Sequence, residues 1–223
     1  MAIIKWFGHA CFQLEMANKI ILIDPWLNGN PISPIKSKEI KKADIVCVTH
    51  DHMDHLGNAF EICKATNATF VSNFEIGLYA EKHGLKSIVG MNIGGTVSID
   101  NIQITMVQAF HSSNRGSPCG FIIKNERKSI YHAGDTGLFG DMKLIGKLYK
   151  PDVALIPIGG YYTMGPIEAV EAVELINPKT VIPMHYMTFP ILEPSPERFI
   201  KALKEKGMEV NVMSLKPGNS YTF

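Results

Sequence analysis

A short run of ligand-type residues directly after an apolar strand constrains this chain most strongly. The β-branched run Ile45–Thr49 ends abruptly in the segment His50–His55, which reads HDHMDH. A lone histidine is most often an ordinary hydrogen-bonding residue, but three His and two Asp among six residues are typical of a metal site. Imidazole and carboxylate groups together suit zinc, iron or manganese. The chain must therefore fold so that the end of this strand faces a site.

Other residues with ligand chemistry follow further β-like runs. His111, Asp135 and His185 each come at the end of an apolar run or within a few residues of it. Taken singly, each is more often structural. The six residues of the His50–His55 segment cannot close two metal sites alone, so these three supply what such a site would lack.

Short β-branched runs punctuated by Gly, Asn and Asp indicate strands, and apolar residues at helical spacing indicate helices. The expected strands are Ile3–Phe7, Cys11–Glu15, Lys19–Asp24, Ile45–Thr49, Thr69–Ser72, Thr96–Ile99, Ile102–Gln108, Gly120–Lys124, Ser129–His132, Val153–Pro157 and Thr180–Ile182. The expected helices are Leu56–Lys64, Glu75–His83, Pro166–Ile176 and Ser195–Lys206. This order favours two sheets packed face to face with helices outside, an α+β architecture, although periodicity alone does not separate it from a doubly wound α/β sheet.

Size and composition set further limits. The chain has 223 residues and is 46% hydrophobic, which fits one domain over residues 1–223 with a substantial core. A formal net charge of +1 and the absence of a basic stripe argue against nucleic acid as a partner. The N-terminus does not resemble a signal peptide, no apolar run reaches the ~18 residues that span a bilayer, and the four cysteines form no CxxC pair. We therefore expect reduced thiols, no membrane contact and a cytoplasmic protein.

The spacing of these residues resembles that of the metallo-β-lactamase superfamily. The resemblance covers nearly the whole chain and rests on His50-x-His52-x-Asp54-His55, followed by His111, Asp135 and His185. Five more segments are similar to a branch of small metal-dependent hydrolases related to ascorbate-6-phosphate lactonase: Trp6–Ala10, Ile23–Pro25, His132–Gly137, Tyr162–Pro166 and Pro183–Tyr186. The chain departs from many relatives at Met187, where they carry Gly, and at Tyr161, where they often carry a different polar residue.

The resemblance implies a four-layer αββα sandwich that holds two divalent metal ions at one edge, with Zn²⁺ first and Mn²⁺ or Fe²⁺ as alternatives. It assigns His50, His52 and His111 to one ion, Asp54, His55 and His185 to the other, and Asp135 to both. Two cations about 3.5–4 Å apart can share one water and lower its pKa towards neutrality, which provides a hydroxide for attack. By the same analogy, Asp54 would orient this hydroxide and move its proton.

Several other residues are candidates for the outer layer of the site or for the pocket. Asp24 and Asp51 could orient a ligating histidine, because such histidines usually donate their second N–H to a carboxylate or carbonyl. His9 follows an apolar strand and could line the pocket, as could Tyr161 and Tyr162 in the loop before a predicted helix. Arg115, in the loop after His111, could pair with an anionic substrate group, although a solvated arginine is the commoner case.

We therefore expect a metal-dependent hydrolase of a small ester, lactone, thioester or phosphoester. The sequence leaves open whether the substrate is anionic and whether the protein forms a homo-oligomer. A metal-dependent nuclease or phosphodiesterase is the main alternative, and it predicts salt-sensitive binding of nucleic acid. An iron enzyme that uses oxygen is a further alternative, separated by metal analysis and oxygen uptake. A non-catalytic scaffold is disfavoured because such proteins tend to lose ligand residues, and this chain has the full set of seven.

Overall fold

The computed structural model describes all residues, 1–223, and contains two mixed β-sheets of seven strands each. In spatial order, the first sheet consists of β14 (Ser220–Thr222), β1 (Ile3–Gly8), β2 (Cys11–Met16), β3 (Lys19–Ile23), β4 (Ile45–Cys47), β5 (Thr69–Asn73) and β6 (Ile88–Met91). The second sheet consists of β13 (Asn211–Val212), β12 (Thr180–Met184), β11 (Val153–Pro157), β10 (Ser129–His132), β9 (Cys119–Lys124), β8 (Ile102–Gln108) and β7 (Thr96–Ile99).

Both sheets follow the same plan. β1, β2 and β3 form an antiparallel meander, and β4, β5 and β6 continue from β3 in parallel. In the second sheet β7 to β10 are antiparallel, and β11, β12 and β13 continue from β10 in parallel. β1, β3 and β4 therefore run the same way in one sheet, as β8, β10 and β12 do in the other. The loops that follow these strands therefore all begin at the same end of their sheet, where the strands have their carboxyl ends.

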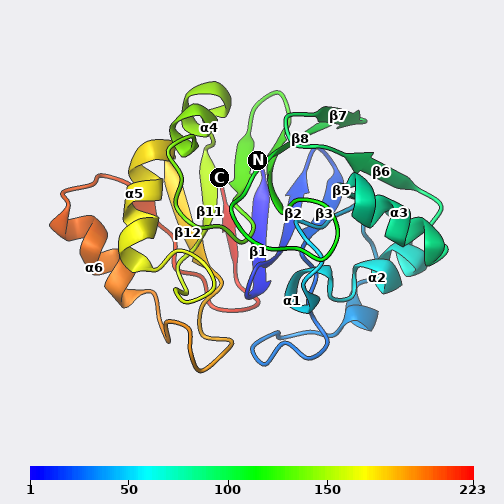
Figure 1. Ribbon diagram of the computed structural model, residues 1–223, viewed down its shortest axis with the longest axis horizontal. Coiled ribbons are helices and arrows are strands. Elements are labelled where there is room, and N and C mark those ends of the chain that lie inside the picture. Colours follow the sequence, from blue (N-terminus) through cyan, green and yellow to red (C-terminus); the bar gives the residue numbers. More distant parts are fainter.

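Helices cover the outer faces of the two sheets (Figure 1). The helices are α1 (Met53–Leu56), α2 (Ala59–Thr66), α3 (Phe74–Lys82), α4 (Met142–Tyr149), α5 (Pro166–Ile176) and α6 (Glu197–Glu205), with a 3₁₀ turn at Ser37–Glu39. α2 and α3 lie on the side of the first sheet, and α4, α5 and α6 lie on the opposite side, against the second sheet (Figure 1). These four layers confirm the predicted αββα sandwich.

The alternation of side chains along β4 shows why this strand reads as continuously apolar. Ile45 and Cys47 belong to a cluster of 45 buried residues that includes residues of both sheets. Val46 and Val48 point the other way, into a cluster of 16 buried residues between the first sheet and its helices. Successive side chains of a strand point to opposite faces, so a strand covered on both sides is apolar at every position.

Most predicted elements are found, and the differences have physical reasons. The helix expected over Leu56–Lys64 is found as α2, which begins only at Ala59, and Leu56 instead ends the separate short helix α1; Gly57, with φ +41°, lies between them. A Cβ at Gly57 would lie 2.6 Å from the Cα of Trp26, so the backbones of these two segments approach each other too closely for any residue but glycine. The structure also contains β6, β13, β14 and α4, which were not predicted.

All four cysteines are free and buried, which confirms the expectation of reduced thiols. Burial raises the pKa of Cys63 to about 12 and holds the pKa of the other three thiols well above its usual value, so none is a thiolate at neutral pH. None of the helices combines the length and the apolar character that crossing a membrane would need.

Candidate functional site

Six segments that carry candidate residues begin where similarly directed strands end. His9 follows β1, Asp24 follows β3 and the His50–His55 segment lies beyond the end of β4. In the second sheet, His111, Asp135 and His185 follow β8, β10 and β12. Carboxyl ends of strands are common places for binding sites in α/β folds. This arrangement brings together residues that are up to 176 positions apart.

Asp135 lies at the centre of the cluster. Its Oδ1 is 3.2 Å from Nε2 of His55, and its Oδ2 is 3.0 Å from Nε2 of His185 and 3.5 Å from Nε2 of His111. Nε2 of His50 lies 2.9 Å from Nδ1 of His52. The ligand atom of Asp54 lies within 4.8 Å of those of His55 and His185, and that of His50 within 4.8 Å of those of His55 and Asp135, so all seven residues that the sequence singles out as ligands meet at one place.

The donor atoms fall into overlapping groups that suit cations. Within each group the donor atoms lie no more than 4.8 Å apart, and the groups are His50, His52 and His111; His50, His55 and Asp135; and His9, Asp54, His55 and His185. Nε2 of His55, Oδ1 of Asp135 and both ring nitrogens of His185 are buried and make no hydrogen bond of good geometry, although the two imidazoles face the Asp135 carboxylate at 3.0–3.2 Å. Buried polar atoms are normally satisfied, so these unpartnered atoms, with their nitrogen and oxygen chemistry, fit a bound metal.

The protonation states of two residues also favour metal binding. Burial lowers the pKa of His50 to about 3, so its ring is neutral and keeps a lone pair for a cation. Burial alone would raise the pKa of the Asp135 carboxyl, but the neighbouring His185 and His55 outweigh it and hold this pKa well below its usual range. Asp135 is therefore an anion that faces several imidazoles, which is the charge a bridging ligand needs.

Comparison with known proteins agrees with this geometry. A beta-lactamase superfamily domain matches residues 3–185 of the chain. The chain is 56% identical over 221 residues to a UPF0173 metal-dependent hydrolase of Caldivirga maquilingensis, covering 98% of this chain and 97% of the relative. The chain belongs to the metallo-β-lactamase superfamily.

Other members of the superfamily resemble the chain over its full length. A UPF0173 metal-dependent hydrolase of Staphylothermus marinus is 53% identical over 230 residues and covers 100% of both chains. The solved structure of a metallo hydrolase of Ignicoccus hospitalis is 40% identical, has a TM-score of 0.93 and covers 100% of this chain and 99% of that chain. These relatives confirm the predicted branch, and the protein is a metal-dependent hydrolase.

Asp24 holds the candidate ligand His55 in place through a hydrogen bond. Its Oδ2 accepts hydrogen bonds from Nδ1 of His55 at 2.7 Å and from the hydroxyl of Thr49 at 2.7 Å, and its Oδ1 accepts one from the Thr49 backbone N–H at 2.8 Å. With Nδ1 held in this way, Nε2 of His55 is directed at Asp135. Asp24 thus lies where the sequence placed it, as an orienting partner of a candidate ligand.

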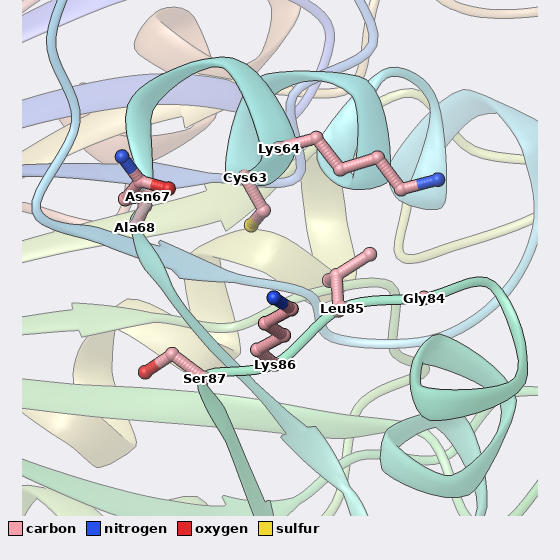
Figure 2. A pocket seen from close by; sticks show the side chains of 8 residues that line it. All are labelled: Cys63, Lys64, Asn67, Ala68, Gly84, Leu85, Lys86 and Ser87. Carbon is pink, nitrogen blue, oxygen red and sulfur yellow. The ribbon is translucent and has the colours of Figure 1, made fainter.

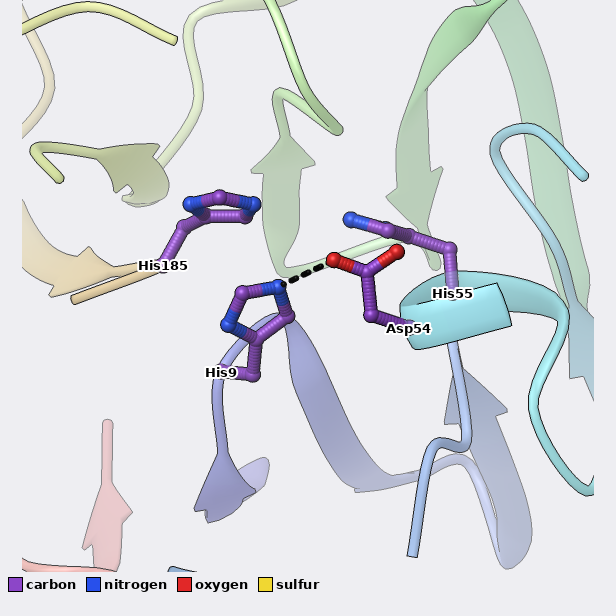
Figure 3. Close-up of side chains that lie close together, drawn as sticks. All are labelled: His9, Asp54, His55 and His185. Carbon is purple, nitrogen blue, oxygen red and sulfur yellow. Dashed lines mark hydrogen bonds and ion pairs between the residues drawn. The ribbon is translucent and has the colours of Figure 1, made fainter. Parts of the chain in front are cut away.

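His9 lies closer to the centre than a pocket wall would require (Figure 3). Its Nε2 is 3.1 Å from Oδ2 of Asp54, and its Nδ1 is 2.6 Å from the hydroxyl of Thr188. Burial, reinforced by His185, lowers the pKa of His9 to about 4, so the ring is neutral at pH 7. A neutral ring has one N–H, which we place on Nε2 so that it donates to Asp54 while Nδ1 accepts from Thr188. No sequence signal pointed to Thr188.

The backbone is strained where the site residues leave their strands. His9, Asp24 and His185 have φ values of +56°, +46° and +58°, in a region that only glycine adopts freely. Met187 has φ +70°, a conformation that glycine adopts more easily than methionine. Such conformations cost about 1–3 kcal/mol each and concentrate at functional sites, where surrounding contacts maintain them.

A cavity of about 730 Å³ opens beside the cluster. The residues lining it are His52, Met53, Asp54, His111, Ser112, Asp135, Tyr162, His185, Phe189, Pro190 and Ile191. Of the two predicted pocket tyrosines, only Tyr162 is among them. Tyr161 is 74% exposed and lies outside the lining, because the loop turns at this residue with φ +55°.

Arg115, which the sequence left as a possible partner for an anionic substrate group, does not line the cavity. Its Nη1 donates to Oδ2 of Asp51 at 2.7 Å, and its guanidinium lies 3.8 Å from the ring centre of Tyr79. Oδ1 of Asp51 accepts two more hydrogen bonds from the loop after His111, from the Ser113 hydroxyl and the Asn114 backbone. Asp51 and Arg115 therefore tie this loop to the His50–His55 segment and do not face the pocket.

Gly159 is needed for the position of His185. A Cβ at residue 159 would lie 2.0 Å from the carbonyl oxygen of His185 and 3.3 Å from its Nδ1. We expect Gly159→Ala to displace His185, to weaken metal binding about 10–100-fold and to lower the free energy of unfolding by about 1–3 kcal/mol. Metal titration followed by calorimetry measures the first effect, and thermal unfolding measures the second.

Gly140→Ala is the matched control, because a Cβ there would meet nothing within 4 Å. It should bind metal as the natural protein does. If Gly159→Ala also bound metal normally, the proposed position of His185 in the site would be wrong.

Proposed function

We propose that this protein hydrolyses a small ester, lactone, thioester or phosphoester at a centre of two divalent cations, with Zn²⁺ as the first candidate and Mn²⁺ or Fe²⁺ as alternatives. The proposal rests on the position of Asp135, whose two carboxylate oxygens face His55 on one side and His111 and His185 on the other. Oδ2 alone faces an imidazole of each proposed ligand set, His111 of one and His185 of the other, so this carboxylate is placed to contact both cations.

The donors divide between two positions. His50, His52 and His111 would hold one cation, Asp54, His55 and His185 would hold the other, and Asp135 would contact both. When bound, such cations lower the pKa of a coordinated water towards neutrality and polarise the substrate oxygen. The donor set of five imidazoles and two carboxylates suits zinc and does not exclude manganese or iron.

Asp54 has the position of a proton acceptor as well as a ligand. The His9 imidazole holds Oδ2, which leaves Oδ1 on the side of His55 (Figure 3). Burial would raise the pKa of Asp54, but the hydrogen bond from His9 and the nearby His55 lower it below its usual range. Asp54 is therefore ionised at neutral pH, and we propose that it orients the attacking water and accepts its proton.

Removal and return of the metal test this function. We expect protein stripped with a chelator to have no activity, and expect Zn²⁺ or Mn²⁺ to restore hydrolysis of at least one member of a panel of lactones, thioesters, carboxylic esters and phosphodiesters. Activity that survives complete stripping would contradict the proposal. So would oxygen uptake by the iron-loaded protein without hydrolysis of any panel member.

The binding of metal should depend on pH through His55. Burial alone would lower the pKa of His55, but Asp135 and Asp24 on its two sides outweigh burial and raise this pKa well above its usual value. Without metal His55 is therefore an imidazolium, and its Nε2 must lose a proton to bind a cation. We expect release of about one proton from this residue at pH 7, and an affinity that rises about tenfold per pH unit up to the raised pKa. Calorimetry in buffers of different ionisation enthalpy measures the proton release.

The same shift predicts opposite pH trends for metal-free and metal-loaded protein. In the metal-free protein, the stabilisation from the raised His55 pKa is complete below the unfolded value of about 6.5 and is lost as pH rises through the folded value. The metal-loaded protein should instead become more stable over that range, because metal binding tightens. Thermal unfolding across the pH range measures both, and parallel curves would contradict the role of His55.

A further inference from the structure

The cavity beside the metal donors has two chemically different parts. One part presents the imidazoles and carboxylates of the centre. The other is formed by Met53, Tyr162, Phe189, Pro190 and Ile191. We infer that this second part, called here the apolar wall, binds the non-reacting portion of the substrate and that this portion is an uncharged alkyl or aryl group. The inference rests on the proposed function and specifies its substrate class.

The apolar wall is held rigidly at its base. The Phe189 ring stacks on Trp26 with 5.7 Å between ring centres and 17° between planes, and it lies nearly perpendicular to the His9 ring with 5.6 Å between ring centres. The loop that carries it is closed by a backbone hydrogen bond of 2.9 Å between the Met187 N–H and the Glu193 carbonyl. A second bond, from the Glu193 N–H to Gly159, ties the loop to the neighbouring segment. A wall already in place binds a ligand without the cost of ordering it.

Two side chains of the apolar wall are largely exposed to solvent and are not covered by other parts of the protein. Ile191 is 50% exposed and Met53 is 77% exposed, although both side chains line the cavity. Exposed apolar groups that gather around a pocket mark a place where a ligand covers them. An alkyl or aryl group that extends from the metal centre would cover these two side chains.

The apolar wall offers no positive charge to an anionic group of the substrate. No lysine or arginine lines it, and the cationic Arg115 is already paired with Asp51. Lysines line other hollows instead, such as the one with Lys64 and Lys86 between α2 and the segment that follows α3 (Figure 2). That hollow contains none of the metal-ligand candidates. An anion on the apolar wall would lose its hydration without gaining a counter-charge.

Two matched esters test the inference on the metal-loaded protein. Phenyl hexanoate and the monophenyl ester of adipic acid have the same leaving group and differ in chain ending, a methyl group in one and a carboxylate in the other. We expect kcat/KM to be about 100-fold higher for phenyl hexanoate, and to rise about fourfold for each methylene added between phenyl acetate and phenyl hexanoate. Equal values for the two esters, a preference for the adipate, or no effect of chain length would overturn the inference.

A charge introduced at the wall should change this preference. We expect Ile191→Lys to narrow the preference for the uncharged ester about fivefold, since the new ammonium group can pair with the carboxylate. Ile167→Lys is the matched control, because Ile167 is similarly exposed, at 58%, and does not line the cavity. It should leave the preference unchanged. An equal change in both variants would show a general effect of charge and overturn the assignment of the wall.

Binding separates failure of this inference from failure of the proposed function. Hexanohydroxamic acid and the monohydroxamic acid of adipic acid carry the same metal-binding group and the same two chain endings. If the protein cleaved neither ester, tighter binding of the hexano compound by calorimetry would still support the apolar wall and leave only the reaction in doubt. Equal or tighter binding of the adipic compound would overturn the inference, whatever the activity.

Discussion

Replacement of Asp135 by asparagine is expected to lower kcat/KM by about 10³-fold or more and to reduce the bound metal. A bridging carboxylate keeps the charges of two cations in place, and cations contribute several kcal/mol of transition-state stabilisation, which corresponds to about 10³-fold in rate. The asparagine side chain would keep the volume of the aspartate but would turn either an uncharged oxygen or an N–H towards His55 and His185. Metal analysis after gel filtration and the kinetics of the best panel substrate measure the two effects.

The exposed Asp141 provides the control for this substitution. Asp141→Asn removes the same charge outside the cavity and should leave metal content and rate unchanged. Full metal content in Asp135→Asn would contradict the bridging role. Loss of fold would be detected by circular dichroism, and in that case Asp135→Glu, which keeps the charge and shifts its position, replaces it as the test and should also bind metal more weakly.

Replacement of Asp24 by asparagine is expected to weaken metal binding about 10–100-fold although Asp24 is not among the proposed ligands. The Asp24 carboxylate holds Nδ1 of His55 and two donors of Thr49, and loss of such an orienting partner typically costs this much in affinity. The side chain is fully buried, so breaking its ionic contact with His55 should also lower the free energy of unfolding of the metal-free protein by about 3–5 kcal/mol.

Asp152→Asn is the matched control for Asp24→Asn. Asp152 also accepts a backbone hydrogen bond, from the Ser129 N–H at 3.0 Å, but it contacts no residue of the site. We expect this variant to bind metal normally. A normal metal affinity in Asp24→Asn, measured by competition with a chromophoric chelator, would show that His55 does not need this partner.

The direction of strands explains how much of the site could be predicted from sequence. Each ligand candidate follows an apolar run, and the carboxyl ends of similarly directed strands meet at one edge of a sheet, so His111, Asp135 and His185 could be paired with the His50–His55 segment before any coordinates. The two-sheet architecture was favoured by the pattern, and the resemblance to a known family made it specific. The role of Asp24 could be predicted because histidines that bind a metal usually donate their second N–H to a carboxylate or a carbonyl.

The features that could not be predicted depend on loops and on weak strand signals. The orientation of Arg115 is set by hydrogen bonds of Asp51 to a loop about 60 residues away, and local sequence does not encode such a contact. Tyr161 and Tyr162 are adjacent and chemically alike, so only the turn at Tyr161 decides which one enters the cavity. β13 and β14 are edge strands of two and three residues, too short to show a period.

The central claim is that two cations share Asp135, and a crystal structure of the metal-loaded protein with anomalous data at the metal's absorption edge tests it most directly. Two anomalous peaks are predicted, one against His50, His52 and His111 and the other against Asp54, His55 and His185, each with an oxygen of Asp135 in its coordination sphere. A single peak at full metal loading, or peaks that Asp135 does not contact, would contradict the account.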